Sequence, residues 1–215
     1  MKRKIIIIGY DPEIIEMILS TDDYSIDGYV DVNKAHNDYF NLNYFGNDEH
    51  FTSKYSYQSS HQLSITLDDT SKREFLYNFY KKKSFKFATI ISKKSNISKY
   101  SRIGEGCIIQ DLTNVSFNIN IGNNVKINTC ANLMHDVVVG DHSTLAPNCV
   151  ILGYVKIGQC CFIGSNSTLL PSITVNANSI LGAGCVATKN LETGIYAGVP
   201  AKRIKWSKWN DIIWC

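Results

Sequence analysis

Aliphatic residues recur at every sixth position through the second half of the chain. All sixteen positions of this series are Ile, Leu or Val: Ile91, Ile97, Ile103, Ile109, Val115, Ile121, Ile127, Leu133, Val139, Leu145, Ile151, Ile157, Ile163, Leu169, Val175 and Leu181. The position four residues after each of them is always small or β-branched, from Ser95 to Cys185. Such a repeat is typical of a triangular parallel β-solenoid, with aliphatic side chains inside and small residues near the corners. It predicts a solenoid of about five coils over residues 89–190.

A second period, of 18 residues, supports the same architecture. Gly104, Gly122, Gly140 and Gly158 each follow an aliphatic position directly. Because three hexads make one coil, these glycines are expected to stack at one corner, where close backbone approach or a positive φ favours glycine. The register has no break, so the sequence predicts that no long loop is inserted into the solenoid.

Residues 1–88 follow a different pattern, typical of a small α/β domain. The apolar run 4–9 predicts a buried strand, and Asp11 and Pro12 suit the N-cap and first turn of a following helix. A second strand over 26–31 completes a βαβ unit of Rossmann type, although the GxGxxG fingerprint of dinucleotide sites is missing. Residues 72–83 predict an amphipathic helix that leads into the solenoid. The polar, Tyr-rich stretch 34–62 permits no assignment.

Residues 191–215 form a third region, because the repeat fails after Cys185. A loop is expected first, followed by a Trp-rich tail. An open solenoid end exposes unpaired strand groups. Trp206, Trp209 and Trp214 are therefore expected to cover that end or to contact another subunit, rather than to form a ligand cage.

Composition narrows the functional classes. A formal charge of +3 over 215 residues gives no support for nucleic-acid binding. No apolar segment reaches 18 residues and no full signal peptide is present, so we expect no membrane insertion and a cytoplasmic location. The seven cysteines form no CxxC pair, and four occupy the small position of the repeat (Cys107, Cys149, Cys161 and Cys185). Buried thiols are favoured over disulfides or metal ligands.

The chain resembles the bacterial hexapeptide-repeat sugar acyltransferases, in the branch of bacillosamine-type aminosugar N-acetyltransferases and sialic acid O-acetyltransferases. The motifs that carry the resemblance are Ile127-Asn128-Thr129, the His135-Asp136 pair and the ending Gly198-Val199-Pro200-Ala201-Lys202. The resemblance implies a Rossmann-like domain that binds a nucleotide-sugar, followed by a left-handed parallel β-helix. It also implies a homotrimer with active sites between subunits, and acetyl-CoA as co-substrate in the groove between adjacent solenoids, with no metal.

The resemblance also assigns roles to individual residues. His135 is implied as the general base, Asp136 as the acid that orients its imidazole, and Gly153 as a backbone N–H contact to the acetyl carbonyl. The implied substrate contacts are Gly9, Tyr10, Asp31, Asn128 and Met134. The implied CoA contacts are Thr144, Ser165, Ala183 and Lys202.

Three departures from the family pattern bear on substrate choice. The usual Gly-Gly-His-Gly or Gly-Gly-His-Ala after the first strand is replaced by residues 9–12, Gly-Tyr-Asp-Pro. Thr144 stands where the family has a second histidine, nine residues after the base. Met134 replaces the acidic residue that often precedes the base.

The chemistry of acyl transfer fits the His135-Asp136 pair. A neutral imidazole can accept the proton of an amine or hydroxyl, and a neighbouring carboxylate can fix its tautomer. Adjacent strand residues point to opposite faces, so Asp136 can serve His135 only if a corner lies at the pair. His142 matches no family position and is expected to be a surface residue.

The leading hypothesis is an acetyl-CoA-dependent N-acetyltransferase acting on a nucleotide-linked amino-dideoxysugar for bacterial surface glycan biosynthesis. O-acetylation of sialic acid or a related sugar is the closest alternative. A zinc enzyme of γ-carbonic anhydrase type needs three histidines, and the solenoid has only His135 and His142. A non-catalytic solenoid scaffold is the third class.

Overall fold

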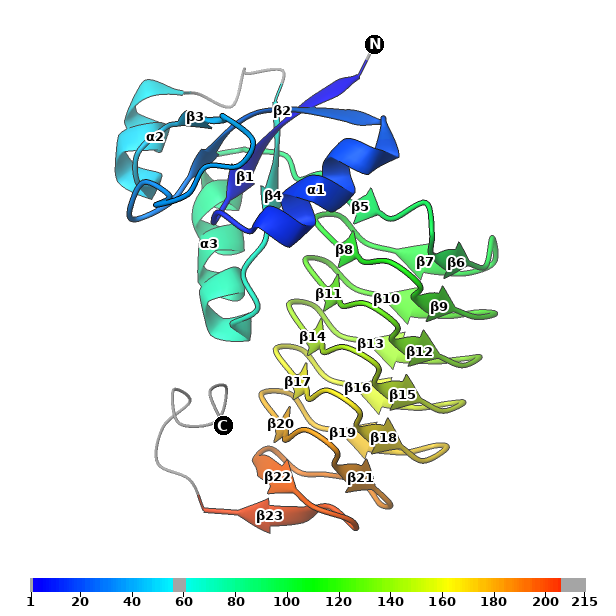
Figure 1. The fold of residues 1–215 in the computed structure, drawn as a ribbon. Coiled ribbons are helices and arrows are strands. Elements are labelled where there is room, and N and C mark those ends of the chain that lie inside the picture. Colours follow the sequence, from blue (N-terminus) through cyan, green and yellow to red (C-terminus); the bar gives the residue numbers. More distant parts are fainter. Residues whose placement is uncertain (1, 56–60, 206–215) are drawn as a thin grey trace.

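The computed structural model describes residues 2–55 and 61–205. The amino-terminal domain contains a parallel sheet with strand order β3-β2-β1-β4 (Figure 1). Its strands are β1 (Arg3–Ile8), β2 (Tyr24–Val30), β3 (Asn43–Tyr44) and β4 (Gln62–Ile65), and its helices are α1 (Pro12–Thr21), α2 (Asp48–Lys54) and α3 (Thr70–Lys82). Because β2 and β4 flank β1, the strand order reverses at β1, and open α/β sheets bind ligands at such switch points.

The predicted βαβ unit is confirmed. The Asp11 carboxylate caps α1 by accepting hydrogen bonds from the backbone N–H groups of Glu13 and Ile14, and Pro12 begins the helix. The third helix begins at Thr70, two residues before the predicted start, because Asp69 supplies an N-cap to its first turn. The unassigned stretch 34–62 contains β3, α2 and the first residue of β4.

The rest of the described chain is a parallel β-helix, as predicted. Seventeen two-residue strands, β5 to β21, follow one another in the described chain: β5 (Ile90–Ile91), β6 (Asn96–Ile97), β7 (Arg102–Ile103), β8 (Ile108–Ile109), β9 (Asn114–Val115), β10 (Asn120–Ile121), β11 (Lys126–Ile127), β12 (Asn132–Leu133), β13 (Val138–Val139), β14 (Thr144–Leu145), β15 (Val150–Ile151), β16 (Lys156–Ile157), β17 (Phe162–Ile163), β18 (Thr168–Leu169), β19 (Thr174–Val175), β20 (Ile180–Leu181) and β21 (Val186–Ala187). With three strands per coil, they make five coils and two further strands.

The strands form three parallel sheets, which we call sheets I, II and III. Sheet I contains β5, β8, β11, β14, β17 and β20, sheet II contains β6, β9, β12, β15, β18 and β21, and sheet III contains β7, β10, β13, β16 and β19. The chain therefore turns at three edges, which we call I–II, II–III and III–I after the sheets they connect. Sheet I continues into β22 (Ile195–Ala197), parallel to β20, and β23 (Lys202–Ile204), antiparallel to β22.

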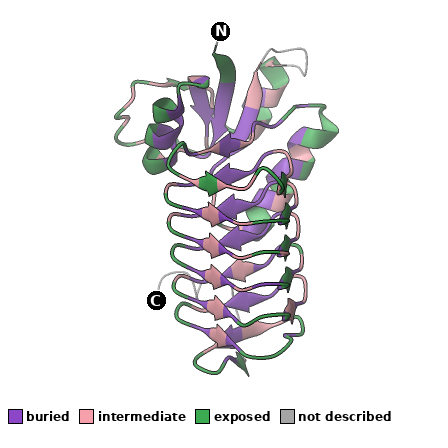
Figure 2. Ribbon diagram, turned by 90° about the vertical axis from the view of Figure 1, so that its right-hand side faces the viewer, coloured by how far each residue is buried: buried purple, intermediate pink, exposed green. Residues whose placement is uncertain are grey.

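The repeat explains the core. The aliphatic series from Val115 to Leu181 is buried inside the prism, and the turns at the edges carry the exposed residues (Figure 2). Cys107, Cys149, Cys161 and Cys185 are buried free thiols, as expected. Glycine is required at the stacked positions because the backbones of neighbouring coils approach closely there. A Cβ on Gly104 would lie 2.5 Å from the carbonyl oxygen of Gly122. The tail tryptophans fall outside the described residues.

Helix α3 fixes the amino-terminal domain against the III–I edge. The guanidinium of Arg73 is fully buried and donates to the side-chain oxygen of Asn124 (3.1 Å) and to the carbonyl of Leu67 (3.1 Å). The Tyr77 ring packs edge-on against the His142 imidazole, with centroids 5.2 Å apart. The expectation that His142 is a surface residue is wrong, because α3 covers the turn that carries it and leaves it 7% exposed.

Candidate active site

His135 and Asp136 form the turn between β12 and β13, at the II–III edge. Asp136 adopts a left-handed backbone conformation (φ 60°), which aspartate tolerates better than most residues. This turn brings the two adjacent side chains together, and His135 Nδ1 lies 2.9 Å from Asp136 Oδ2. Because a carboxylate can only accept, Nδ1 carries the proton and Nε2 presents a lone pair. The corner required by the sequence argument is therefore present.

The Asp136 carboxylate is held in its ionised form. The Asn118 amide, one coil earlier, donates to Asp136 Oδ1 at 2.7 Å. This hydrogen bond and then that from His135 hold the pKa of Asp136 below its ordinary value. An ionised Asp136 favours the Nδ1–H tautomer and stabilises the imidazolium that forms when Nε2 takes a proton.

Gly153 lies one coil after His135 on the same edge. A Cβ at Gly153 would lie 2.7 Å from Cε1 and 2.8 Å from Nε2 of the imidazole. The Tyr154 backbone N–H donates to the His135 carbonyl (3.1 Å), and its ring meets the imidazole edge-on at 5.1 Å. Within residues 2–55 and 61–205, the Gly153 N–H has no hydrogen-bond acceptor. Met134, half-buried, precedes His135 on this edge.

A second group of candidate residues lies on the I–II edge. Asn128 is 7% exposed, and its Nδ2 donates to the Leu145 carbonyl at 2.9 Å. It borders a cavity of about 280 Å³ between α1 and the solenoid, whose lining residues are Glu13, Asp68, Gln110, Asn128, Ala146, Pro147, Phe162 and Ser165. Ala183 follows Ser165 by one coil and is exposed on the same edge. His135 does not line this cavity.

The third group lies at the carboxyl ends of β1 and β2. The Gly9 N–H donates to the Val30 carbonyl, and Gly9 has a positive φ of 89°. The Tyr10 N–H donates to Asp31 Oδ2 (2.9 Å), and the Tyr10 hydroxyl donates to Asp38 (3.0 Å). Gly9, Tyr10 and Asp31 are thus brought together, at the switch-point edge of the sheet where such domains bind ligands.

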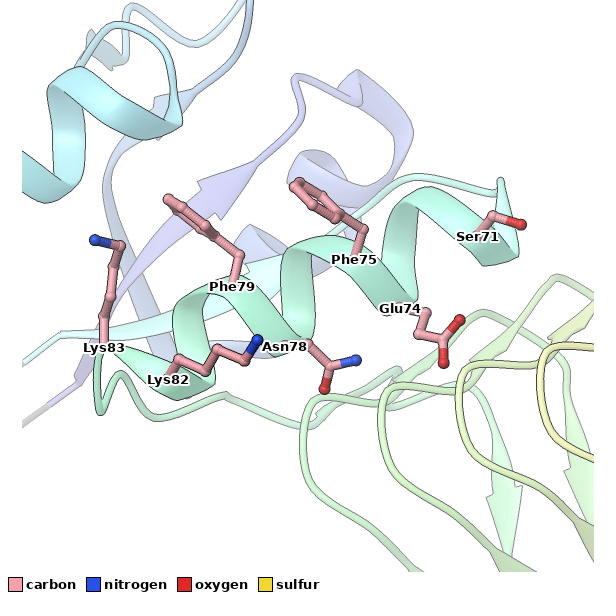
Figure 3. A pocket seen from close by; sticks show the side chains of 7 residues that line it. All are labelled: Ser71, Glu74, Phe75, Asn78, Phe79, Lys82 and Lys83. Carbon is pink, nitrogen blue, oxygen red and sulfur yellow. The ribbon is translucent and has the colours of Figure 1, made fainter.

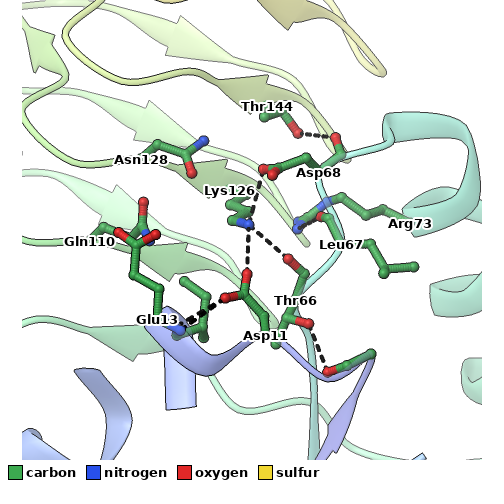
Figure 4. A network of polar contacts seen from close by, with 12 residues as sticks. Asp11, Glu13, Thr66, Leu67, Asp68, Arg73, Gln110, Lys126, Asn128 and Thr144 are labelled. Atoms are coloured by element: carbon green, nitrogen blue, oxygen red, sulfur yellow. Dashed lines mark hydrogen bonds and ion pairs between the residues drawn. The ribbon is translucent and has the colours of Figure 1, made fainter. Parts of the chain in front are cut away.

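Lys126, which the sequence analysis missed, joins the solenoid to that edge. Its ammonium is 2.7 Å from the Thr66 carbonyl, 2.9 Å from Asp68 Oδ1 and 3.6 Å from Asp11 Oδ2 (Figure 4). The side chain is 2% exposed although it points away from the solenoid core. Its strand position faces outward, and such positions in a hexapeptide repeat are normally solvent-exposed. The sequence pattern therefore did not indicate that Lys126 is buried.

Two of the predicted CoA contacts differ in their surroundings. Thr144 is fully buried, and its hydroxyl donates to the Asp68 carbonyl at 3.0 Å, so it joins the solenoid to the segment before α3. Within one chain this side chain faces the amino-terminal domain, and its role as a CoA contact stays a prediction. Lys202 is exposed on β23.

Two negative observations hold for residues 2–55 and 61–205. No group of three or more His, Cys, Asp or Glu side chains is placed to hold a metal ion there. In the same ranges, no helix has the length and apolar character needed to cross a membrane.

Fold and site together define a hexapeptide β-helix protein with an α/β domain at its amino end. The family described as "Bacterial transferase hexapeptide (six repeats)" matches residues 118–153 and 154–189. Residues 118–189 of the solenoid are therefore similar to this family. The GDP-perosamine N-acetyltransferase of Escherichia coli O157:H7 is 33% identical over 96 residues, which is 45% of this chain and 43% of that protein. The chain spans less than half of the length of the curated relatives it matches.

Solved structures extend the likeness to the whole fold. The acetyltransferase domain of PglB from Neisseria gonorrhoeae FA1090 superposes with a TM-score of 0.88 at 20% identity, covering 94% of this chain and 100% of that one. PerB from Caulobacter crescentus, solved in complex with CoA and GDP-perosamine, superposes with a TM-score of 0.85 at 24% identity, covering 94% and 97%. At these identities the likeness shows a shared fold.

Proposed function

We propose that this protein transfers the acetyl group of acetyl-CoA to the amino group of a nucleotide-linked amino-dideoxysugar. The observation that carries the proposal is the exposed His135 imidazole, oriented by an ionised Asp136 and set against the backbone of Gly153. A free imidazole lone pair beside an unpaired backbone N–H is the arrangement that acyl transfer needs. The similarity of the repeat region to the GDP-perosamine N-acetyltransferase of Escherichia coli O157:H7 supports the choice of an amine as nucleophile.

The proposed reaction is a direct transfer. The acceptor nitrogen attacks the thioester carbonyl carbon while His135 Nε2 takes the proton that this nitrogen loses. The Gly153 N–H donates to the carbonyl oxygen as it becomes negative. The C–S bond then breaks, and the imidazolium returns its proton to the CoA thiolate. Asp136 holds Nδ1–H throughout and stabilises the transient imidazolium.

We further propose a homotrimer with active sites between subunits. Within one chain, His135 lies on the II–III edge, whereas Asn128, Ser165 and Ala183 lie on the I–II edge. The II–III edge also carries exposed apolar side chains next to the base, namely Tyr100, Phe117, Tyr154 and Leu170. Contiguous exposed apolar surface marks interaction sites. Packing this edge against the I–II edge of a neighbour would bring the two groups together, with acetyl-CoA in the groove between them.

The acceptor's nucleotide is proposed to lie at the carboxyl ends of β1 and β2. Gly9, Tyr10 and Asp31 converge there, and a sugar extending toward Asn128 would enter the cavity beside α1. An amino-dideoxysugar of this kind is used in surface glycans of bacteria, and such a pathway is the context that we propose.

The test is an acceptor panel with purified protein. Acetyl-CoA is mixed with UDP-, dTDP- and GDP-linked aminosugars, with the matching sugars that carry hydroxyl in place of the amine, and with sialic acid. Release of free CoA thiol with an amino acceptor alone supports the proposal. Release with sialic acid or another hydroxyl acceptor favours O-acetylation, and no release with any sugar contradicts both activities and favours a scaffold.

A further inference from the structure

The cavity between α1 and the I–II edge contains two buried amide side chains, each with an unused hydrogen-bonding atom. Gln110 is 5% exposed and Asn128 is 7% exposed, and both line this cavity of about 280 Å³. Gln110 Oε1 accepts from the Thr129 N–H (3.0 Å), and Asn128 Nδ2 donates to the Leu145 carbonyl (2.9 Å). Within residues 2–55 and 61–205, Gln110 Nε2 and Asn128 Oδ1 have no partner, yet neither atom is sealed from solvent. Because buried amides are normally fully hydrogen-bonded, these two atoms indicate a polar ligand.

The hollow on the outer face of α3 lacks this feature, although its volume of about 590 Å³ is larger (Figure 3). None of the seven described residues that line it is buried, so water can reach all of its polar groups. A few convergent polar groups in an otherwise enclosed cavity are typical of a small-molecule site. The cavity beside α1 is therefore the better candidate for a specific ligand.

The charges around this cavity favour an uncharged ring over a phosphate group. The Asp11 carboxylate already accepts from the N–H groups that begin α1, so this helix end is not free to bind an anion. Glu13, in the first turn of α1, lines the cavity, and a neighbouring cavity of about 320 Å³ shares Glu13 and Gln110 with it. Among the described residues that line these two cavities, Lys94 is the one cation, and it is paired with Asp111 at 2.7 Å. The cavity therefore suits the sugar part of the acceptor and not its diphosphate.

The cavity wall becomes apolar further along the I–II edge. Ala146 lies one coil after Asn128, and Pro147 and Phe162 line the cavity with it. A sugar ring has hydroxyl groups around its rim and C–H groups on its faces, so it matches a wall that is polar in one part and apolar in another. The volume lies near the lower limit of small-molecule sites, about 300 Å³, which suits a single ring.

Glu13 and Gln110 reach the cavity from different elements. Glu13 extends from α1 and Gln110 from the I–II edge (Figure 4). A hydroxyl group both donates and accepts, so one hydroxyl can donate to the Glu13 carboxylate and accept from Gln110 Nε2. We propose that this pair recognises one ring hydroxyl of the acceptor sugar, while Asn128 Oδ1 accepts from a second hydroxyl. The inference rests on the proposed function and assigns Glu13 and Gln110 to it as specificity-determining residues.

Calorimetric binding in the absence of acetyl-CoA tests the pair separately from catalysis. The wild-type protein is titrated with the UDP-, dTDP- and GDP-linked aminosugars, and the one that binds most tightly is used for the variants. Gln110→Glu keeps Oε1 for the Thr129 N–H but loses the donor, so its Kd for this acceptor should rise about 10- to 100-fold. Glu13→Ala should raise the same Kd about tenfold. The Kd for acetyl-CoA should not change in either variant.

The matched control is Glu16→Ala, which removes an exposed carboxylate of α1 that lines only the neighbouring cavity and should leave the acceptor Kd unchanged. Acceptors that each lack one ring hydroxyl provide a second readout. One of them should bind the wild type weakly, and Gln110→Glu should weaken its binding no further. Damage to the fold would instead weaken the binding of all of them alike.

Acceptor binding that neither Gln110→Glu nor Glu13→Ala alters would overturn the inference. Weaker acetyl-CoA binding in these variants would overturn it too, because the cavity would then hold part of CoA. If Gln110→Glu lowers the melting temperature, Glu13→Ala still decides, since this exposed side chain is not part of the core. Binding of no nucleotide-linked aminosugar would contradict the inference and the proposed function together, whereas specific binding without thiol release would contradict only the transferase activity.

Discussion

Gly153 and the imidazole of His135 are in direct contact across adjacent coils, and only a residue without a Cβ fits. The missing Cβ would lie 2.7 Å from Cε1, well inside the distance at which two carbons attract each other. The same closeness places the Gly153 backbone beside Nε2. The glycine therefore admits the ring, and in the proposed mechanism its backbone N–H donates to the acetyl oxygen.

We expect Gly153→Ala to reduce kcat strongly while the protein stays folded. His135 is exposed and can rotate away from the added methyl group, so the clash is relieved at the expense of the catalytic geometry. A loss of about 10²-fold fits a misplaced general base. Gly182→Ala is the matched control, because its Cβ would meet nothing closer than 3.5 Å. Steady-state rates and melting temperatures of both variants check this; a Gly153→Ala enzyme of normal kcat would contradict the assignment.

Removing the base itself should have the larger effect. His135→Ala is expected to lower kcat by about 10²–10⁴-fold, the usual contribution of a positioned general base. The melting temperature should hardly change, because 47% of the side chain is exposed. His50→Ala, at an exposed histidine in α2, serves as the control. A His135→Ala protein that keeps full function would support the scaffold hypothesis instead.

Asp136→Asn isolates the charge of the carboxylate, because asparagine also tolerates the left-handed turn at this position. The pKa of Asp136 is lowered, so it is ionised across the range in which a histidine titrates. Without that charge the Nδ1–H tautomer of His135 is held less firmly and the imidazolium of the transition state is stabilised less, so kcat should fall by about 10²–10⁴-fold. Steady-state rates of both proteins measure this. An unchanged kcat would mean that Asp136 does not act on the base.

A site shared between subunits predicts complementation. His135→Ala and Asn128→Ala chains should each be inactive alone, since each damages one edge of every site. Co-expressed in equal amounts, they should regain about one quarter of the wild-type sites, namely those with both intact edges at one interface. The double variant co-expressed with itself should stay inactive. Mixed trimers isolated with two affinity tags and assayed for thiol release provide the measurement, and no recovery would place both residues in one subunit's site.

The repeat made the solenoid predictable because each coil is specified locally. One aliphatic and one small residue per hexad determine which side chains are buried, and the turn at His135-Asp136 follows from the register alone. The orientation of the pair also follows, since every corner of the described coils falls at the same hexad position.

The junction between the domains could not be predicted in this way. The junction contains three residues that the sequence pattern predicts to be solvent-exposed, because they occupy outward or helical positions: Lys126, Arg73 and His142. In the structure, α3 or the segment before it buries each of them. Their partners across the junction are at least 51 residues away in sequence, so no local pattern indicates them. The contact of Thr144 with Asp68 could not be predicted for the same reason, and its role as a CoA contact stays a prediction.

His142 makes that junction sensitive to pH. Burial lowers the pKa of His142, and Asn124 Nδ2 lies 3.0 Å from its Nδ1, a hydrogen bond that only the neutral ring can accept. The folded pKa is below the unfolded value of about 6.5, so the unfolded chain binds the extra proton first as pH falls. This contribution to stability is complete above the unfolded pKa and declines below it, by less than about 1.4 kcal/mol per pH unit.

His142→Asn keeps the left-handed turn and an acceptor for Asn124 but removes the titration. Urea unfolding between about pH 5 and pH 8 should therefore show a smaller loss of stability toward acid in the variant than in the wild type. Parallel curves would show that His142 is protonated alike in the folded and unfolded states.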